Sequence, residues 1–279
     1  GFNVAFNMSA IKNKMTELDG DVSYIGLPTS VIHSLNFDQE VSRSAIGQPI
    51  GSFYAYKEDG LFQSEAEIKS YTNNKGELLQ PNAKPGDIKF VDVNGDGVID
   101  GNDRDYIGNP IPDVTAGLTL GVNFHNFDLS LFFQGMFGND VYDLTRYVGD
   151  FYNQSQYNKN SRVVNAWTPT NTNTDIPRVT MDDPNNNIRP SSYYVQDASF
   201  VRLKNMKIGY SVPQSILSKI KFNSLYIYAQ ATNLFTITGY DGIDPEVGLQ
   251  SYSSDYRNLD MGVHRGIYPL SRTFTFGVN

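Results

Sequence analysis

The fold is set by the stretch Asp113-Val-Thr-Ala-Gly-Leu-Thr-Leu-Gly-Val-Asn-Phe124, in which apolar and small or polar residues alternate without a break. Successive side chains of a β-strand point to opposite faces of the sheet. The alternation therefore places the Val, Ala, Leu and Phe side chains on one face and the Asp, Thr, Gly and Asn side chains on the other. The stretch predicts a strand over 113–124 with one apolar face.

The residues after this strand predict an antiparallel partner. A tight turn near His125-Asn126 leads into a second alternating stretch, 127–134, so the two stretches form a hairpin. Phe132 interrupts the polar face of the second strand. Its apolar face is formed by Phe127, Leu129, Leu131 and Phe133.

Four more stretches predict strands. The first strand, over 2–9, alternates with one apolar face. In 195–212 the apolar parity switches around Asn205, which predicts a β-bulge there. Pro213 ends that stretch. The remaining segments are a short turn over 213–222 and strands over 223–237 and 268–276.

Three long segments separate these strands, and all are rich in Gly, Pro, Asn or Asp. They cover 19–111, 139–194 and 238–266. Inside the first, Ser64 followed by Glu67 predicts a capped helical turn. We expect these segments to be loops, and we expect the first of them to be too polar to build a hydrophobic core.

Short and long links thus alternate along an all-β chain. That asymmetry is typical of an antiparallel transmembrane β-barrel, with short turns at the periplasmic rim and long loops outside the cell. A soluble sandwich more often keeps short loops at both ends. The sequence therefore predicts a portion of such a barrel, with 19–111, 139–194 and 238–266 as extracellular loops.

Composition excludes several classes of function. The formal net charge of −8 argues against a nucleic-acid partner. The absence of cysteine excludes disulfides, thiolate metal sites and Cys nucleophiles. The Asp and Glu residues form no catalytic motif, so we predict no catalytic residues and no enzyme. Metal or triad spacing is also missing among the histidines, which are His33, His125 and His264.

One segment of the first long loop has the spacing of an EF-hand calcium loop. Oxygen-bearing side chains fall at its first, third, fifth, ninth and twelfth positions, and Gly97 at the sixth permits a sharp turn. Ile99 is expected to point into apolar packing. Asp103 stands where an EF-hand has a bidentate Glu, which weakens the expected binding. The predicted ligands of a structural Ca²⁺ are Asp92, Asn94, Asp96, Val98 (through its carbonyl), Asp100 and Asp103.

The order of several short motifs resembles the C-terminal part of SusC/RagA-type TonB-dependent outer-membrane transporters. Each motif is weak alone, but together they span nearly the whole chain. They are Gly47-Gln-Pro-Ile-Gly51-Ser-Phe-Tyr54, Asp59-Gly60-Leu-Phe62, Gly86-Asp-Ile-Lys-Phe90 leading into 92–103, Ile107-Gly-Asn-Pro-Ile-Pro-Asp113, Asp128-Leu-Ser-Leu-Phe-Phe-Gln-Gly135, Ser199-Phe-Val-Arg-Leu-Lys-Asn205, Ile208-Gly-Tyr210, Ala231-Thr-Asn-Leu-Phe235 and Asp244-Pro-Glu246.

The resemblance implies a plugged barrel of about 22 strands, of which this chain supplies roughly the last six. It also implies import of oligosaccharides or peptides, a SusD-like lipoprotein as a lid, contact with the TonB complex, outer-membrane lipid around the barrel, and a dimer of transporter–lipoprotein pairs. We expect the plug and the TonB-contacting segment to lie outside this chain. The natural C-terminus is expected beyond Gly277-Val278-Asn279, because such barrels finish on an aromatic residue.

A second hypothesis remains open, namely a secreted, calcium-stabilised β-sheet module that binds glycans. In that protein the apolar strand faces are buried against a second sheet, and loop aromatic rings stack on sugars. Trp167 is more often a packed loop anchor, and Arg202 and Lys204 are more often structural residues of the wall than substrate contacts. The rings in question are those of Trp167, Tyr193 and Tyr194.

Overall fold

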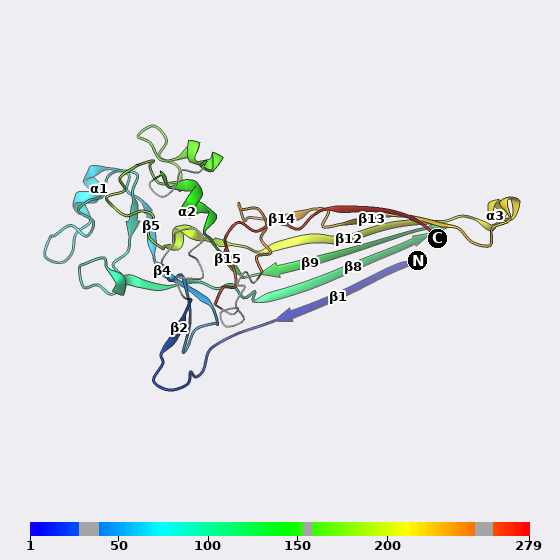
Figure 1. Cartoon of the computed structure of the whole chain (residues 1–279), viewed down its shortest axis with the longest axis horizontal. Coiled ribbons are helices and arrows are strands. Elements are labelled where there is room, and N and C mark those ends of the chain that lie inside the picture. The colour runs from blue at the N-terminus through cyan, green and yellow to red at the C-terminus, as the bar shows by residue number, and fades with distance from the viewer. Residues whose placement is uncertain (28–38, 153–157, 249–258) are drawn as a thin grey trace.

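The computed structural model of the chain describes residues 1–27, 39–152, 158–248 and 259–279. The molecule is elongated, with a long curved sheet at one end and a body of loops at the other (Figure 1). Among the described residues, no helix has both the length and the apolar character needed to cross a membrane.

The long sheet contains the six predicted strands in antiparallel order β1-β8-β9-β12-β13-β16. The predicted hairpin is confirmed, since β8 and β9 pair from Val114↔Phe137 to Phe124↔Phe127, and His125 takes the positive φ of 53° that the tight turn requires. The strands are β1 (Phe2–Ala10), β8 (Val114–Phe124), β9 (Phe127–Phe137), β12 (Phe200–Ser211), β13 (Tyr226–Thr232) and β16 (Thr273–Val278), and β14 (Thr236–Thr238) also pairs with β12.

One face of this sheet is apolar from edge to edge and lies open. A row of opposed residues crosses all six strands: Val4, Leu120, Leu131, Met206, Ala231 and Phe274. Phe2 and Phe276, near the two edges, remain 73% and 80% exposed. No second sheet covers this face in the described part of the chain, contrary to what the secreted-module hypothesis requires. An open apolar face of this size suits lipid rather than water.

The predicted bulge is confirmed. The register between β12 and β9 shifts between Leu203 and Asn205, so Lys204 is the extra residue that reconciles the two apolar halves of the strand.

Several predicted boundaries are wrong, and each has a local cause. The 223–237 strand breaks into β13 and β14 because Asn233 takes a positive φ of 51°. The first residues of 195–212 form a separate strand, β11 (Val195–Asp197), in another sheet. The 213–222 turn contains the helix α3 (Gln214–Ile220), and the last strand runs to Val278 rather than 276.

The described parts of the segments 19–111, 139–194 and 238–266 gather at one end of the sheet, and we call them the loop body (Figure 1). They form the short sheets β2-β3-β4-β7 and β5-β6, and with β11, which directly follows 139–194, the sheet β11-β10-β15. The strands are β2 (Tyr24–Gly26), β3 (Ser42–Ala45), β4 (Ser52–Tyr56), β5 (Glu58–Leu61), β6 (Ile88–Phe90), β7 (Arg104–Gly108), β10 (Asp140–Asp143) and β15 (Val263–His264). The helices are α1 (Glu65–Ser70) and α2 (Thr145–Asp150), with 3₁₀ turns at Gly101–Asp103, Ser161–Asn165 and Ser192–Tyr194.

The expectation that the segment 19–111 cannot build a hydrophobic core is wrong, because Phe53, Ile88 and Phe90 are fully buried. The largest buried cluster lies in the loop body and takes residues from all three segments, including Phe53, Tyr142 and Val263. Ile99 packs against it, as predicted. The core residues come from short apolar runs in three segments that lie far apart in the sequence, so only long-range contacts bring them together.

The loop aromatics belong to that core. Trp167 is 7% exposed and donates its indole N–H to Gln63 Oε1 at 2.9 Å, which confirms it as a packed anchor. Tyr193 and Tyr194 are 3% and 0% exposed. None of the three rings is available to stack on a sugar. The capped turn is also confirmed, because Ser64 Oγ accepts from the Glu67 amide at the start of α1.

Candidate functional site

A buried ion-pair cluster joins the polar face of the long sheet to the loop body. Arg202, on the polar face of β12, is 2% exposed. Its guanidinium donates to Asp244 Oδ1 at 2.5 Å, to Glu246 Oε2 at 3.0 Å and to Thr236 Oγ1 at 2.8 Å. The bulged Lys204 adds a second cation, 2.9 Å from Glu246. These contacts fasten residues 239–248, the segment after β14, to the polar face of the sheet. We call the contacts the clasp and residues 239–248 the clasp segment.

The electrostatics of the clasp keep Asp244 ionised. Burial alone would raise the pKa of Asp244, but hydrogen bonds from the Glu246 amide and from Arg202 outweigh it and hold the pKa below its usual value. The Leu270 amide donates to the other carboxylate oxygen at 3.1 Å. Arg202 and Lys204 are therefore structural, as predicted, and are not free to meet a substrate.

A polar hollow of about 380 Å³ lies in the loop body beside the clasp segment. Arg146 of α2 forms two hydrogen bonds to Asp241, at 2.9 and 3.0 Å, across one side of the hollow. Glu58 of β5 and Asp175 also line it, and both continue into a neighbouring hollow of about 600 Å³. Such a surface can hydrogen-bond a polar ligand through carboxylates, amides and hydroxyls.

Glu58 carries an unusual proton affinity for a carboxyl group at this surface. Burial raises its pKa to about 7, the nearby Asp175 contributes in the same direction, and Arg146 opposes the shift. The charge of the hollow therefore changes near neutral pH.

Replacing Glu58 with glutamine is expected to stabilise the protein at pH 8 and to have little effect at pH 4. The folded pKa of Glu58 lies above its unfolded value of about 4.3, so wild-type stability falls as pH rises between the two. The gain at pH 8 should be about 2 kcal/mol. Thermal unfolding of both proteins at the two pH values measures it. Glu65→Gln on the exposed face of α1 is the control; an equal gain there would contradict the assignment.

The predicted calcium loop folds as a chain of carboxylate-capped turns. Gly95 and Gly97 take positive φ angles of 73° and 90°. Asp92 accepts the amides of both glycines, at 2.7 and 2.9 Å. Asp103 is fully buried and accepts the Val93 and Asp100 amides. The six predicted ligands are thus close in the chain, and the polar side chains among them cap successive turns of one loop.

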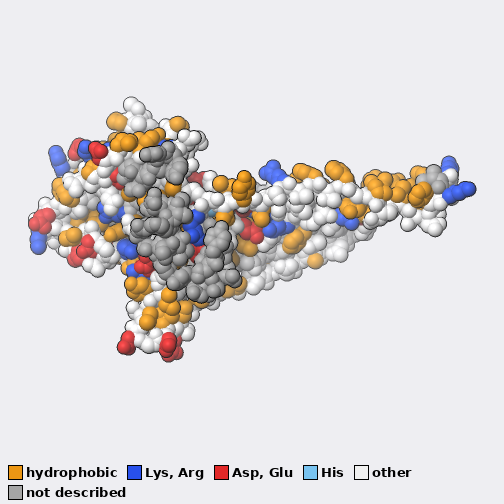
Figure 2. Space-filling view, viewed as in Figure 1, with side chains coloured by type: hydrophobic (Ala, Val, Ile, Leu, Met, Phe, Trp, Pro, Cys, Tyr) orange, Lys and Arg blue, Asp and Glu red, His pale blue; other side chains and the backbone are white. Residues whose placement is uncertain are grey.

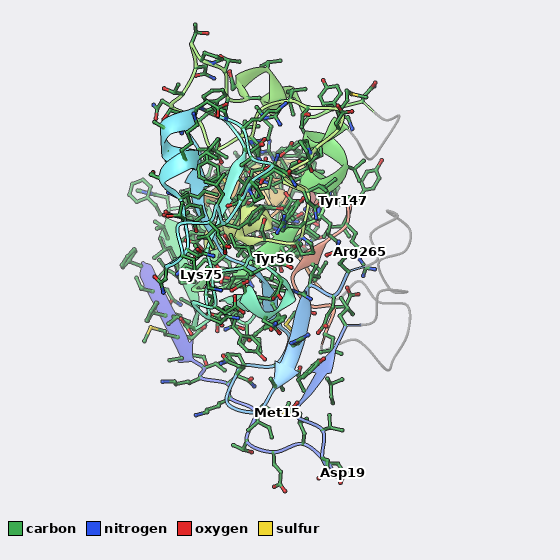
Figure 3. The ribbon with its side chains drawn as sticks, turned by 90° about the vertical axis from the view of Figure 1, so that its left-hand side faces the viewer. Met15, Asp19, Tyr56, Lys75, Tyr147 and Arg265 are labelled. Atoms are coloured by element: carbon green, nitrogen blue, oxygen red, sulfur yellow. The ribbon has the colours of Figure 1, made fainter. Side chains whose placement is uncertain are left out.

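The oxygen atoms of this loop are the type that a hard cation prefers, but in this structure the carboxylates accept hydrogen bonds from backbone amides. In the described residues no three Asp, Glu or His side chains gather as a metal site. Each carboxylate would have to exchange amide donors for the ion. Lys75 lines the same small hollow as Asp92 and Asp96, at one side of the loop body (Figure 3).

His264 is fully buried among polar groups. Its Nδ1 lies 2.8 Å from Tyr240 Oη and 3.4 Å from Asp143 Oδ1. Burial would raise the pKa of Asp143, but hydrogen bonds from His264 and Thr145 lower it below its usual value. The group ties β10, β15 and the clasp segment together. His125 sits in the β8–β9 turn, and His33 lies outside the described residues.

Sequence reasoning missed the hollow. Glu58, Arg146 and Asp241 are separated by roughly 90 residues each and sit in different long segments. No motif connects them. The only signal was Asp244-Pro-Glu246, which marks the clasp segment but not its partners.

Comparison with known proteins shows relatives along the whole chain. The chain is 37% identical over 279 residues to TonB-dependent receptor P3 of Formosa agariphila. It is 26% identical over 281 residues to TonB-dependent receptor SusC of Bacteroides thetaiotaomicron. In each case the match covers 100% of this chain. No family model matches.

A solved structure of the RagAB peptide transporter shares the fold. Its TM-score is 0.69, with 21% identity over 99% of this chain and 26% of that one. The chain spans about a quarter of the length of the curated relatives it matches, 26% of P3 and 24% of SusC.

Proposed function

The chain is a segment of an outer-membrane TonB-dependent receptor of the SusC/RagA type, and on that premise we propose that the whole protein imports oligosaccharides or peptides. The observation that carries the proposal is the open apolar face of the long sheet, which suits strands that cross a membrane. The polar face opposite would line the transport path. Transport of this kind requires a selective passage and a lid, so it needs no residues that break covalent bonds.

The asymmetry of the links supports an orientation for the segment. The β8–β9 and β12–β13 turns lie at one end of the sheet and the loop body at the other (Figure 1). By analogy with other outer-membrane barrels, the turns face the periplasm and the loop body faces the exterior. The loop body then shapes the mouth of the transporter, and its polar hollow is open to incoming solute.

Partners follow from the same premise. A SusD-like lipoprotein would close the mouth, the TonB complex would act through a part of the protein outside this segment, and two transporter–lipoprotein pairs would form a dimer. The RagAB protein that shares the fold is a peptide transporter. That likeness supports peptides as one substrate class for this protein, whereas the resemblance to SusC-type transporters supports oligosaccharides.

Uptake by cells with and without the intact gene tests the proposal. Cells carrying the gene should accumulate at least one labelled oligosaccharide or peptide from a panel, and deletion should abolish that uptake. A panel in which every substrate enters equally well after deletion would overturn it. Uptake of peptides alone, or of glycans alone, would decide between the two substrate classes.

We also propose that the loop formed by Asp92, Asn94, Asp96, Val98, Asp100 and Asp103 binds Ca²⁺ and stiffens the loop body. Carboxylate, amide and carbonyl oxygens are the ligands that a hard cation prefers. The ion would supply only structural charge neutralisation. Because Ile99 already packs on the core, the ion would reinforce that packing rather than replace it.

Calcium should raise the unfolding temperature of the wild-type protein, and Asp96→Ala should weaken the binding at least about tenfold because it removes a charged ligand. Isothermal titration of both proteins measures the affinity. Asp105→Ala, an exposed carboxylate just outside the loop, is the matched control and should bind as the wild type does. Equal affinity of wild type and Asp96→Ala would refute the site.

A further inference from the structure

The link between β12 and β13 is longer and more structured than a barrel turn needs to be. Residues 212–225 carry the helix α3 and project beyond the rest of the sheet, at the end opposite the loop body (Figure 1). A two-residue turn suffices at the neighbouring β8–β9 link. The additional residues therefore make a surface of their own.

Local interactions hold this projection in a defined shape. Pro213 is the N-cap residue of α3, and its carbonyl accepts the amides of Ile216 and Leu217. At the other end Lys221 adopts a left-handed φ of 59°, and the amides of Lys221 and Phe222 both donate to the Leu217 carbonyl. That is a Schellman-type ending. Leu217 is 3% exposed, so one side of the short helix is anchored.

The exposed side of the projection combines apolar and basic groups. Ile216 and Phe222 are 49% and 56% exposed. Lys219 and Lys221 are exposed as well. From Ser211 to Leu225 there is no Asp or Glu, although the whole chain has a net charge of −8. Figure 2 shows basic side chains at this tip.

The projection also continues the apolar face of the sheet. That face ends beside it in Phe124, Phe127 and Ile227, which are 67%, 53% and 45% exposed, and in Tyr210, whose ring lies 4.6 Å from that of Phe127. Aromatic residues at the edge of an apolar band mark the membrane–water interface in membrane proteins. Hydrophobic side chains extend along the sheet toward the tip (Figure 2).

We propose that the α3 projection lies in the membrane interface at this rim and binds anionic phospholipid headgroups. Ile216 and Phe222 enter the boundary between headgroups and acyl chains, and Lys219 and Lys221 pair with the phosphates. Basic residues attract an anionic lipid surface, and a partly apolar helix lies in its plane. The inference rests on the proposed transporter only in requiring that the long sheet cross the membrane.

The test places environment-sensitive labels in the full-length protein, reconstituted in nanodiscs with and without phosphatidylglycerol in phosphatidylcholine. Single cysteines are introduced by Ser218→Cys on α3, Ile208→Cys on the apolar face and Lys75→Cys on the loop body. This segment contributes no native cysteine. Quenching of each label by brominated acyl chains reports its contact with lipid.

Labels at 218 and 208 should both be quenched, and the label at 75 should not. Phosphatidylglycerol should increase quenching at 218 alone. Lys219→Gln and Lys221→Gln should each lower the ratio of lipid-contacting to free label at 218 roughly five-fold. Lys69→Gln, on an exposed position of α1, is the matched control and should leave the ratio unchanged.

Three results would overturn the inference. If 208 is quenched but 218 is no more quenched than 75, the projection faces the aqueous phase and serves a soluble partner or none. If 218 is quenched without any response to phosphatidylglycerol or to the lysine variants, anionic headgroups are not its ligand. If neither 218 nor 208 is quenched, the membrane-crossing sheet fails together with the inference, which separates this case from the first.

Discussion

Replacing Arg202 with methionine releases the clasp segment from the wall of the sheet, at a cost of about 3–5 kcal/mol. The substitution leaves Asp244 and Glu246 without the guanidinium that lies 2.5 and 3.0 Å from them. Removing one member of a buried ion pair is costly because the remaining charge keeps its desolvation penalty without compensation. Methionine retains much of the volume of the side chain, so the loss reports charge rather than a cavity.

Hydrogen exchange of the full-length protein measures this effect. Amides of residues 239–248 should exchange roughly 10²- to 10⁴-fold faster in Arg202→Met, while those of β8 and β9 should be unchanged. Arg202→Lys, which keeps the charge but loses the bidentate fork, should fall between the two. Lys69→Met on the exposed face of α1 is the control. Unaltered exchange in 239–248 would show that the clasp does not hold the segment.

Replacing Gly209 with valine should destabilise the long sheet by about 1–3 kcal/mol. A Cβ at this position would overlap the hydroxyl of Tyr226, whose ring lies across the glycine. The clash would also break the 2.9 Å hydrogen bond from Tyr226 to Asp128. Tyr228 covers Gly277 in the same way, and Lys207 lies 5.0 and 4.8 Å from the centroids of the two rings.

The loss of the folded form on heating, followed by electrophoretic mobility in detergent, measures the change. Gly121→Ala is the matched control, since Gly121 lies on the same polar face but its Cβ would meet Asn3 at an ordinary 3.5 Å. The expected order of stability is wild type, then Gly121→Ala, then Gly209→Val. A Gly209→Val protein as stable as the control would mean that the tyrosine ring moves freely off the glycine.

A structural feature could be predicted from the sequence only where it leaves a local pattern. The strands of the long sheet leave such a pattern, because β-strand geometry imposes a two-residue period on any strand with one lipid-facing side. The 113–134 hairpin and the parity switch near Lys204 followed from that period and are confirmed. The break at Asn233 did not follow, since a single left-handed residue leaves no periodic signal.

The candidate site was predictable only where its residues are neighbours in the chain. The 92–103 loop was visible because a calcium-like ligand set is local, with ligands every second residue; whether it binds calcium stays a proposal. The polar hollow and the clasp were not visible, because Arg146 meets Asp241, and Arg202 meets Asp244, across separations of 95 and 42 residues.

The sequence by itself determined the transmembrane class of sheet, its hairpin and bulge, and the family to which the segment is similar. Only the tertiary structure decided that the supposed loops share a hydrophobic core, that Trp167, Tyr193 and Tyr194 are buried in it, and that the β12–β13 turn carries a basic, apolar projection. The physical reason is the range of the contacts. Pleating acts between successive residues, whereas core burial and charge pairing act between residues that the fold alone brings together.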